Sequence, residues 1–161
     1  KWLSFIPYVC HCIRKRYTPD MSVELVGVLN LTPDSFSDGG KYTDIAKALE
    51  HADSMFAAGA SYVDVGGEAT NPTAEPITED EEWQRLEPIL SVLLPRYGEK
   101  ISVDTRHPEI VERAIRYGRF IVNDVTTFID PKMIAVTARH GLTAIASHLP
   151  LAAQGNIQDA H

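Results

Sequence analysis

Two apolar runs of the chain end in polar side chains that could bind a flat heterocycle. Asp104 closes residues 102–104, and Asn123 closes residues 121–123. A carboxylate and an amide on adjacent strand ends suit an amino-pyrimidinone edge, whose N–H groups face the carboxylate and whose ring acceptor faces the amide. The alternative is a structural role in bonding loop amides, which is the stronger interpretation for Asp124.

The first apolar run, residues 23–29, ends at another amide, Asn30. Apolar strands bury their side chains, so an amide at the strand end is free to bind a group that lies outside the sheet. Asn30 could bind a phosphate or a hard metal ion, or it could simply cap a turn. The residues that follow, 31–40, are rich in Pro, Ser and Gly, and they predict a loop able to bend over a ligand with Phe36 at its tip.

A second loop begins with two glycines after the run Tyr62–Val65. Glu68 and Thr70 follow these glycines, so backbone and hydroxyl donors could meet an anion there. Asp64 lies inside the apolar run itself and is interpreted as a buried structural group.

Short apolar runs alternate with helical patterns along the chain, which predicts a parallel sheet built by right-handed crossovers. No Gly-x-Gly-x-x-Gly follows the first strand, and polar residues follow each strand, so a (β/α) barrel is favoured over a dinucleotide-binding fold. Within the second helical pattern, Pro88 predicts a bend or an interruption. The predicted strands are 23–29, 62–65, 101–103, 120–122 and 143–146, and the predicted helices are 44–58, one starting at 78, 108–118 and 132–140.

Composition bounds the class of protein. The chain has 161 residues, 44% of them hydrophobic, and a formal charge of −7, which argues against a nucleic-acid partner. No apolar run reaches the ~20 residues of a membrane helix, and two cysteines favour a reducing, cytoplasmic setting. Residues 1–20 are predicted to be an extension or linker, and residues 21–161 one barrel domain.

Four motifs in order, residues 27–40, 64–70, 102–105 and 121–124, closely resemble dihydropteroate synthase, the pterin-binding enzyme family of folate synthesis. The resemblance implies a TIM-type barrel of eight strands, of which this chain holds about five. It implies that dihydropterin-methyl diphosphate condenses with para-aminobenzoate, with Mg²⁺, to give dihydropteroate and diphosphate. The diphosphate is expected to leave first, and the aniline nitrogen then attacks a cationic pterin-methylene group.

The resemblance also implies a role for individual residues. Asn30 would meet the magnesium–diphosphate group and, with Asp38, would be catalytic. Sulfonamides would compete at the para-aminobenzoate site. The pterin would contact Asp104, Asn123 and Thr70, and the para-aminobenzoate loops would contribute Phe36, Ser35, Asp38 and Pro72.

The chain departs from the family pattern in two places. Asn71 stands where the family usually has an arginine, and the chain stops at His161 after about five strands. We therefore expect an incomplete barrel: a fragment of a longer enzyme, a chain completed by a second copy, or a non-catalytic pterin binder. The full-length family is expected to be homodimeric, and a folate-dependent methyltransferase of the pterin-binding barrel group is the alternative enzyme.

Overall fold

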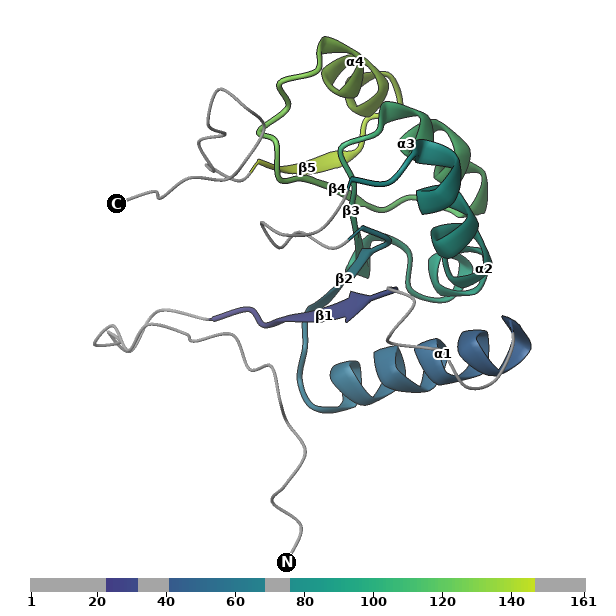
Figure 1. Ribbon diagram of the computed structural model, residues 1–161. Coiled ribbons are helices and arrows are strands. Elements are labelled where there is room, and N and C mark those ends of the chain that lie inside the picture. The colour runs from purple at the N-terminus through teal and green to yellow at the C-terminus, as the bar shows by residue number, and fades with distance from the viewer. Residues whose placement is uncertain (1–22, 32–40, 69–75, 147–161) are drawn as a thin grey trace, which may run out of the picture.

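The computed structural model describes residues 23–31, 41–68 and 76–146, which form a parallel sheet with helices on one side (Figure 1). Strands and helices alternate along the chain, as the sequence predicts. The strands are β1 (Val26–Asn30), β2 (Tyr62–Gly66), β3 (Ile101–Asp104), β4 (Ile121–Asp124) and β5 (Thr143–Ala146). The helices are α1 (Lys41–Ala57), α2 (Glu79–Tyr97), α3 (Pro108–Ala114) and α4 (Pro131–Arg139), with short 3-10 turns η2 (Gly98–Lys100) and η3 (Ile115–Tyr117).

The sheet has the strand order β1-β2-β3-β4-β5, and every neighbouring pair is parallel. Each strand therefore lies beside its sequence neighbour, and a helical connection joins consecutive strands. Helix α2 contacts α1 and α3, and α3 contacts α4, so the helices form one continuous layer. This progression around one layer is the arrangement from which (β/α) barrels are built.

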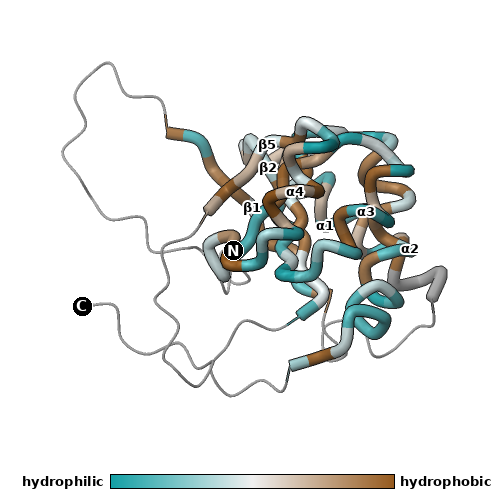
Figure 2. The backbone as a smooth tube through the Cα atoms, turned by 90° about the horizontal axis from the view of Figure 1, so that it is seen from above, coloured by the Kyte–Doolittle hydropathy of each residue, from teal (hydrophilic) through white to brown (hydrophobic). Residues whose placement is uncertain are grey.

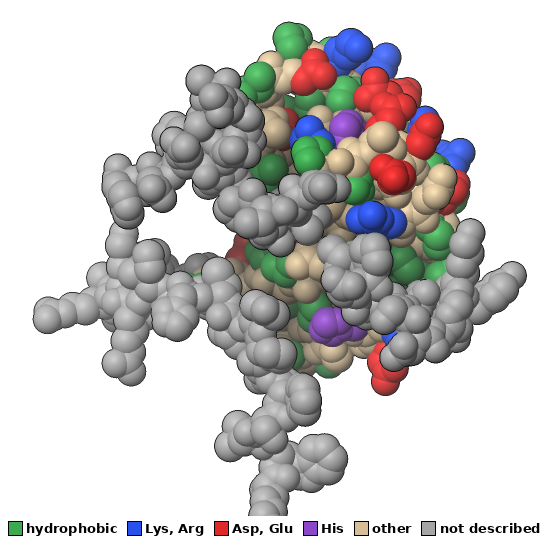
Figure 3. All heavy atoms as spheres, in the orientation of Figure 1, with side chains coloured by type: hydrophobic (Ala, Val, Ile, Leu, Met, Phe, Trp, Pro, Cys, Tyr) green, Lys and Arg blue, Asp and Glu red, His purple; other side chains and the backbone are tan. Residues whose placement is uncertain are grey.

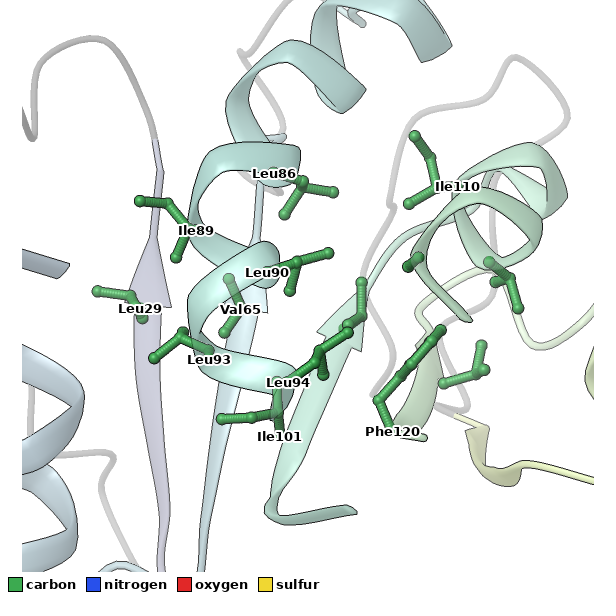
Figure 4. Packing of buried hydrophobic residues seen from close by; sticks show 14 of the residues in the cluster. Leu29, Val65, Leu86, Ile89, Leu90, Leu93, Leu94, Ile101, Ile110 and Phe120 are labelled. Atoms are coloured by element: carbon green, nitrogen blue, oxygen red, sulfur yellow. The ribbon is translucent and has the colours of Figure 1, made fainter. Parts of the chain in front are cut away.

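The core lies between the sheet and the helix layer. Leu29, Val65, Val103 and Val122 are aligned by the strand register, and all four are buried. Helix α2 covers them with a row of apolar side chains, which point toward the strands in Figure 4. Burying each such side chain contributes roughly 1.5–3 kcal/mol, so this row of α2 is a large part of the core. The row consists of Leu86, Ile89, Leu90, Leu93 and Leu94.

The outer side of the helix layer is polar. Hydrophobic and hydrophilic residues alternate along α2 and α3 (Figure 2). Acidic and basic side chains mix over the part of the surface formed by α3 and α4 (Figure 3). Among the described residues, none of the helices is both long and apolar enough to cross a membrane.

Helix α2 starts where the sequence predicts but continues through Pro88. Thr78 and Glu81 form a complete capping box, in which the Thr78 hydroxyl accepts from the Glu81 N–H and the Glu81 carboxylate accepts from the Thr78 N–H. Of the predicted bend or interruption at Pro88, the interruption is wrong, because one helix spans Glu79–Tyr97. A proline removes the bond to the carbonyl four residues earlier, but Gln84 is exposed, so water can satisfy that carbonyl.

Other boundaries shift by a few residues. Pairing of β1 begins at Val26 rather than at Val23, because Val26 is the first residue in register with β2. The third predicted helix ends at Ala114 and tightens into η3, which closes at Gly118 with a φ of 147°. Such differences are common at element ends, where the hydrogen-bonding pattern changes.

Candidate functional site

A row of four residues crosses β1 to β4 at the carboxyl ends of the strands. Asn30 is in register with Gly66, Gly66 with Asp104, and Asp104 with Asn123. Side chains alternate along a strand, and the preceding residue on each strand faces the helices. The four positions of this row, which we call the rim row, therefore lie on the opposite face of the sheet.

Gly66 places a buried backbone without a side chain between two polar side chains of the rim row. A Cβ at this position would lie 3.6 Å from Oδ2 of Asp104 and 3.7 Å from Oδ1 of Asn30. Both side chains thus flank the backbone of Gly66, and the gap between them contains no side chain of β2. A flat ligand could lie against this backbone and reach polar atoms on both sides.

Asn123 is oriented by a second carboxylate on the same face. Its Nδ2 donates toward both oxygens of Asp64, at 3.3 Å and 3.2 Å. Burial raises the pKa of Asp64, while the Ser102 hydroxyl and the Asn123 amide oppose the rise. The Oδ1 atom of Asn123 is buried and has no hydrogen-bond partner among the described residues, so it remains an acceptor for a ligand N–H. The expectation that the amide meets a ring acceptor is therefore corrected, because Asp64 already binds the Nδ2 donors.

Asp104 is the carboxyl group whose charge the site disfavours most clearly. Burial raises its pKa to about 7, and repulsion from Asp64, Asp124 and Glu68 adds to the effect. Within the described part of the chain, no hydrogen bond ends on its carboxylate. A ligand with N–H donors would supply the bonds that Asp104 lacks and would favour its ionised form.

Asp124 has the structural role that the sequence favours for it. Its carboxylate accepts from the N–H and hydroxyl of Thr126, at 2.8 Å and 2.7 Å, and from the N–H of Phe128 at 3.0 Å. These bonds hold the loop after β4, in which Thr127 and Phe128 have φ values of 63° and 57°. Two successive non-glycine residues in this region indicate a strained turn that Asp124 stabilises.

The structure brings together only part of the predicted site. It places Asn30, Asp104 and Asn123 in the rim row, whereas the remaining predicted residues lie outside the described ranges. Those are Ser35, Phe36 and Asp38 in the first loop and Thr70 and Pro72 in the second.

Two contributors to the site are not predicted by the sequence. Asp64 is largely buried, as the sequence predicts, but it also lies on the rim-row face and orients Asn123. Its position two residues before Gly66 carries the signal, since residues two apart on a strand share a face. Arg106 binds Glu68 through two hydrogen bonds, and nothing in its sequence surroundings marks this pairing.

The sequential order of parallel strands, with polar groups gathered at their carboxyl ends, is typical of the (β/α) barrel class, in which small-molecule sites lie at that edge. Residues 26–159 match the family model described as "Pterin binding enzyme". The chain belongs to this pterin-binding enzyme family.

Curated and solved relatives are dihydropteroate synthases. The Bacillus subtilis enzyme is 44% identical over 125 residues, which are 77% of this chain and 44% of that protein. The structure of the Anaplasma phagocytophilum enzyme with bound 6-hydroxymethylpterin-monophosphate has a TM-score of 0.70 and 38% identity, over 80% of this chain and 50% of that one. The Xanthomonas albilineans enzyme with 4-aminobenzoic acid has a TM-score of 0.70 and 33% identity, over 79% and 46%.

These likenesses extend over only part of each relative. The chain spans about half the length of the curated relatives that it matches. The likeness in structure nevertheless includes the alternating strands and helices that carry the rim row.

Proposed function

We propose that the protein acts in the dihydropteroate synthase reaction. Dihydropterin-methyl diphosphate and para-aminobenzoate would be joined to give dihydropteroate and diphosphate. The observation that carries the proposal is the rim row, in which Asp104 follows Gly66 across the sheet and is followed by Asn123, whose Oδ1 acceptor has no partner among the described residues. Membership of the pterin-binding family and relatives bound to both substrate classes support it.

The rim row suits the polar edge of a pterin. The Asp104 carboxylate accepts from the amino and ring N–H groups, and Oδ1 of Asn123 accepts from a further N–H. Asp64 holds Asn123 in this orientation by taking its Nδ2 donors. Neither acceptor has another partner in the described part of the chain, so binding favours a ligand with a donor-rich edge.

The chemistry needs little from a general base. The bond between the pterin methylene carbon and the diphosphate oxygen breaks, and a bond from that carbon to the aniline nitrogen forms. One proton leaves the nitrogen after it attacks, and the electron pair of the broken bond leaves with diphosphate. Because the aniline is neutral before attack, positioning and charge stabilisation contribute most.

The residues at the end of β1 fit a magnesium ion in part. Asn30 presents an exposed amide oxygen at the strand end, and Mg²⁺ commonly combines one or two protein oxygens with water and substrate phosphates. No group of three His, Cys, Asp or Glu in the described residues could hold a metal ion, so Asn30 would supply one ligand and the diphosphate others. A bound Mg²⁺ would neutralise the charge of the leaving diphosphate.

Further parts of the proposal concern the wider setting of the reaction. We propose that the protein works as a homodimer in the cytoplasm and that sulfonamides compete at the para-aminobenzoate loops; membership of the family and a relative solved in complex with a sulfonamide drug support the last point.

The test incubates the protein with dihydropterin-methyl diphosphate, para-aminobenzoate and Mg²⁺ and measures dihydropteroate. Product formation supports the proposal, and pterin binding without turnover favours a binding-only protein. Transfer of a methyl group from a methylated folate instead would favour the methyltransferase alternative. A folded sample that shows none of these contradicts all three.

The pterin contact itself is tested by Asp104→Asn. Removing the charged acceptor should weaken pterin binding, measured by calorimetry, by roughly 1–3 kcal/mol. Asp80→Asn is the matched control, because Asp80 is exposed on α2 and pairs with Arg113 on the outer surface. Equal affinity in Asp104→Asn and the unaltered protein would remove Asp104 from the site.

A further inference from the structure

A second row of side chains crosses β1 to β4 beneath the rim row. Strand register aligns Val28 with Asp64, Asp64 with Ser102, and Ser102 with Ile121. Each of these residues stands two positions before a member of the rim row, so the second row lies on the same face of the sheet. Its two polar members, Asp64 and Ser102, are therefore neighbours, with an apolar residue on either side.

The hydroxyl of Ser102 is a buried donor that lacks an acceptor. Ser102 is 1% exposed, and its Oγ atom has no hydrogen-bond partner in the part of the chain that the structure describes. A buried hydroxyl is costly to leave unpaired, and its hydrogen can rotate toward an acceptor. The hydroxyl already lies close enough to Asp64 to lower the pKa of that carboxyl group. A direct bond to the Asp64 carboxylate would give this donor its partner.

The ionisation state of Asp64 decides how the amide of Asn123 can be oriented. An ionised carboxylate only accepts hydrogen bonds, so it must face the Nδ2 donor of Asn123, which lies 3.2 Å and 3.3 Å from its two oxygens. The buried Oδ1 acceptor is then left for a ligand N–H. A protonated Asp64 would be able to donate to Oδ1 instead, and the turned amide would present Nδ2 to the ligand. Two donors would then oppose each other at the N–H edge of a pterin.

Ionised Asp64 depends on hydrogen-bond donors rather than on cations. Burial raises its pKa, and the two influences that lower it are the Ser102 hydroxyl and the Asn123 amide. Asp104, on the same face of β3, repels Asp64 and also works against ionisation. The flanking members of the second row are apolar and carry no charge. Ser102 is thus one of two groups on which the ionised state depends.

We propose that Ser102 is a positioning residue that acts through Asp64 to keep the Oδ1 acceptor of Asn123 turned toward the ligand. Its hydroxyl donates to the Asp64 carboxylate, and the carboxylate holds the amide by Nδ2. Strands β2, β3 and β4 each contribute one member of this chain of hydrogen bonds. The choice of a pterin as the ligand rests on the proposed function, whereas the dependence of Asp64 on Ser102 does not.

NMR titration of the Asp64 carboxyl carbon tests the contact without a ligand. Ser102→Ala should raise the pKa of Asp64, because a donor to the ionised form is lost. Ser102→Thr keeps the hydroxyl and should leave this pKa close to that of the unaltered protein. Ser91→Ala is the matched control, since the Ser91 hydroxyl donates to the Pro88 carbonyl within α2 at 2.8 Å. An unchanged pKa in Ser102→Ala, or an equal rise in Ser102→Thr, overturns the role of the hydroxyl.

Calorimetry with 6-hydroxymethylpterin at two pH values tests the link to the ligand. At about pH 6, Ser102→Ala should bind roughly tenfold more weakly than the unaltered protein, because the pterin must then displace a proton from Asp64. At about pH 8.5 Asp64 should be ionised in both proteins, and their affinities should agree within about twofold. Titration of the pterin itself is identical in the two samples. An equal loss at both pH values would indicate a packing defect and would overturn positioning through Asp64.

A double-mutant cycle provides a second readout that a packing defect does not reproduce. The side chain in Asp64→Asn cannot ionise, so adding Ser102→Ala should change pterin affinity by less than about twofold at either pH. A further tenfold loss at about pH 6 in that background would show that Ser102 acts independently of Asp64.

The role of Ser102 and the proposed function fail in different ways. An unchanged pKa of Asp64 in Ser102→Ala, in a protein that binds pterin and forms dihydropteroate, overturns only the role of Ser102. A raised pKa in a protein that binds no pterin supports the contact between Ser102 and Asp64 and contradicts both the proposed function and the link of this contact to a pterin.

Discussion

The neighbours of Asp104 change its pKa in a way that favours binding of a particular kind of ligand. Burial and three other carboxyl groups raise its pKa to about 7, so near neutral pH it is partly protonated. A ligand that donates N–H groups binds the ionised form, and the energy of those bonds must overcome the cost of ionisation. Without a ligand, repulsion from the neighbouring carboxyl groups disfavours the ionised form of Asp104. A ligand must offset this cost with N–H donors, so the site is selective for a donor-rich edge.

Pterin affinity should therefore depend on pH. Below pH 7 the ligand must displace a proton from Asp104, so affinity should fall roughly tenfold per pH unit, and above pH 7 it should level off. Calorimetry from about pH 5.5 to 8.5 measures this dependence. Asp104→Asn serves as the control because the pterin titrates identically in both proteins. The same pH dependence in Asp104→Asn as in the unaltered protein would contradict the expectation.

Gly66 and Gly67 are adjacent, yet alanine at each should have a different effect. At Gly66 the added Cβ meets Asp104 and Asn30 at ordinary contact distances of 3.6–3.7 Å. Gly66→Ala should leave stability nearly unchanged but weaken pterin binding by about 1 kcal/mol or more, because it fills the floor of the rim row. Thermal unfolding and calorimetry on one sample separate the two effects, and unaltered affinity would show that the ligand lies elsewhere.

Gly67→Ala acts at the scale of a helix contact. Its Cβ would lie 3.3 Å from the backbone carbonyl of Glu82, in addition to the close side-chain contacts, so the turn and α2 must separate. We expect a loss of about 1–3 kcal/mol in the free energy of unfolding, measured with urea. Gly66→Ala is the matched control, and equal stability of the two variants would contradict this packing.

At the scale of elements, the sequence predicts most of the fold. Apolar runs and helical spacing are local, so five strands and four helices could be assigned, and Thr78 marks the start of α2 through its capping box. Whether Pro88 interrupts the helix cannot be predicted from the sequence, because it depends on whether water reaches the carbonyl of Gln84. That exposure is set by the tertiary structure. The rim row was only partly predictable. Asp104 and Asn123 end their apolar runs, whereas the pairing of Asp64 with Asn123 depends on strand register.

At the scale of the whole molecule, the two faces of the sheet differ in character. One face is buried under the helix layer, while the rim-row face exposes Val26, Val28 and Ile145. It also carries Asp64 and Asp104, whose pKa values burial raises, and burial raises the pKa of Glu82, which lies against Gly67, to about 7. Folding therefore places three acids where their ionised forms are disfavoured, and the stability of the molecule should depend on pH.

The direction follows from comparing the folded and unfolded pKa values of Glu82. The pKa rises from 4.5 to about 7, so both states are protonated below pH 4.5 and the contribution to stability is fully present there. Between pH 4.5 and 7 only the unfolded state ionises, so the free energy of unfolding falls as pH rises, by up to about 3 kcal/mol for this group. Above pH 7 its contribution is lost.

Glu82→Gln should remove this part of the pH dependence. Urea unfolding at about pH 5 and pH 8 should show a smaller drop in the variant, and at pH 8 the variant should be more stable because no ion is buried. Glu81→Gln is the control: Glu81 is exposed, and its hydrogen bond from the Thr78 backbone lowers its pKa, so it is ionised at both pH values. Replacing the Glu81 carboxylate should therefore change the free energy of unfolding by the same amount at both pH values. An equal drop in Glu82→Gln and the unaltered protein would mean that the buried carboxyl group ionises at its ordinary pKa and that its burial carries no electrostatic cost.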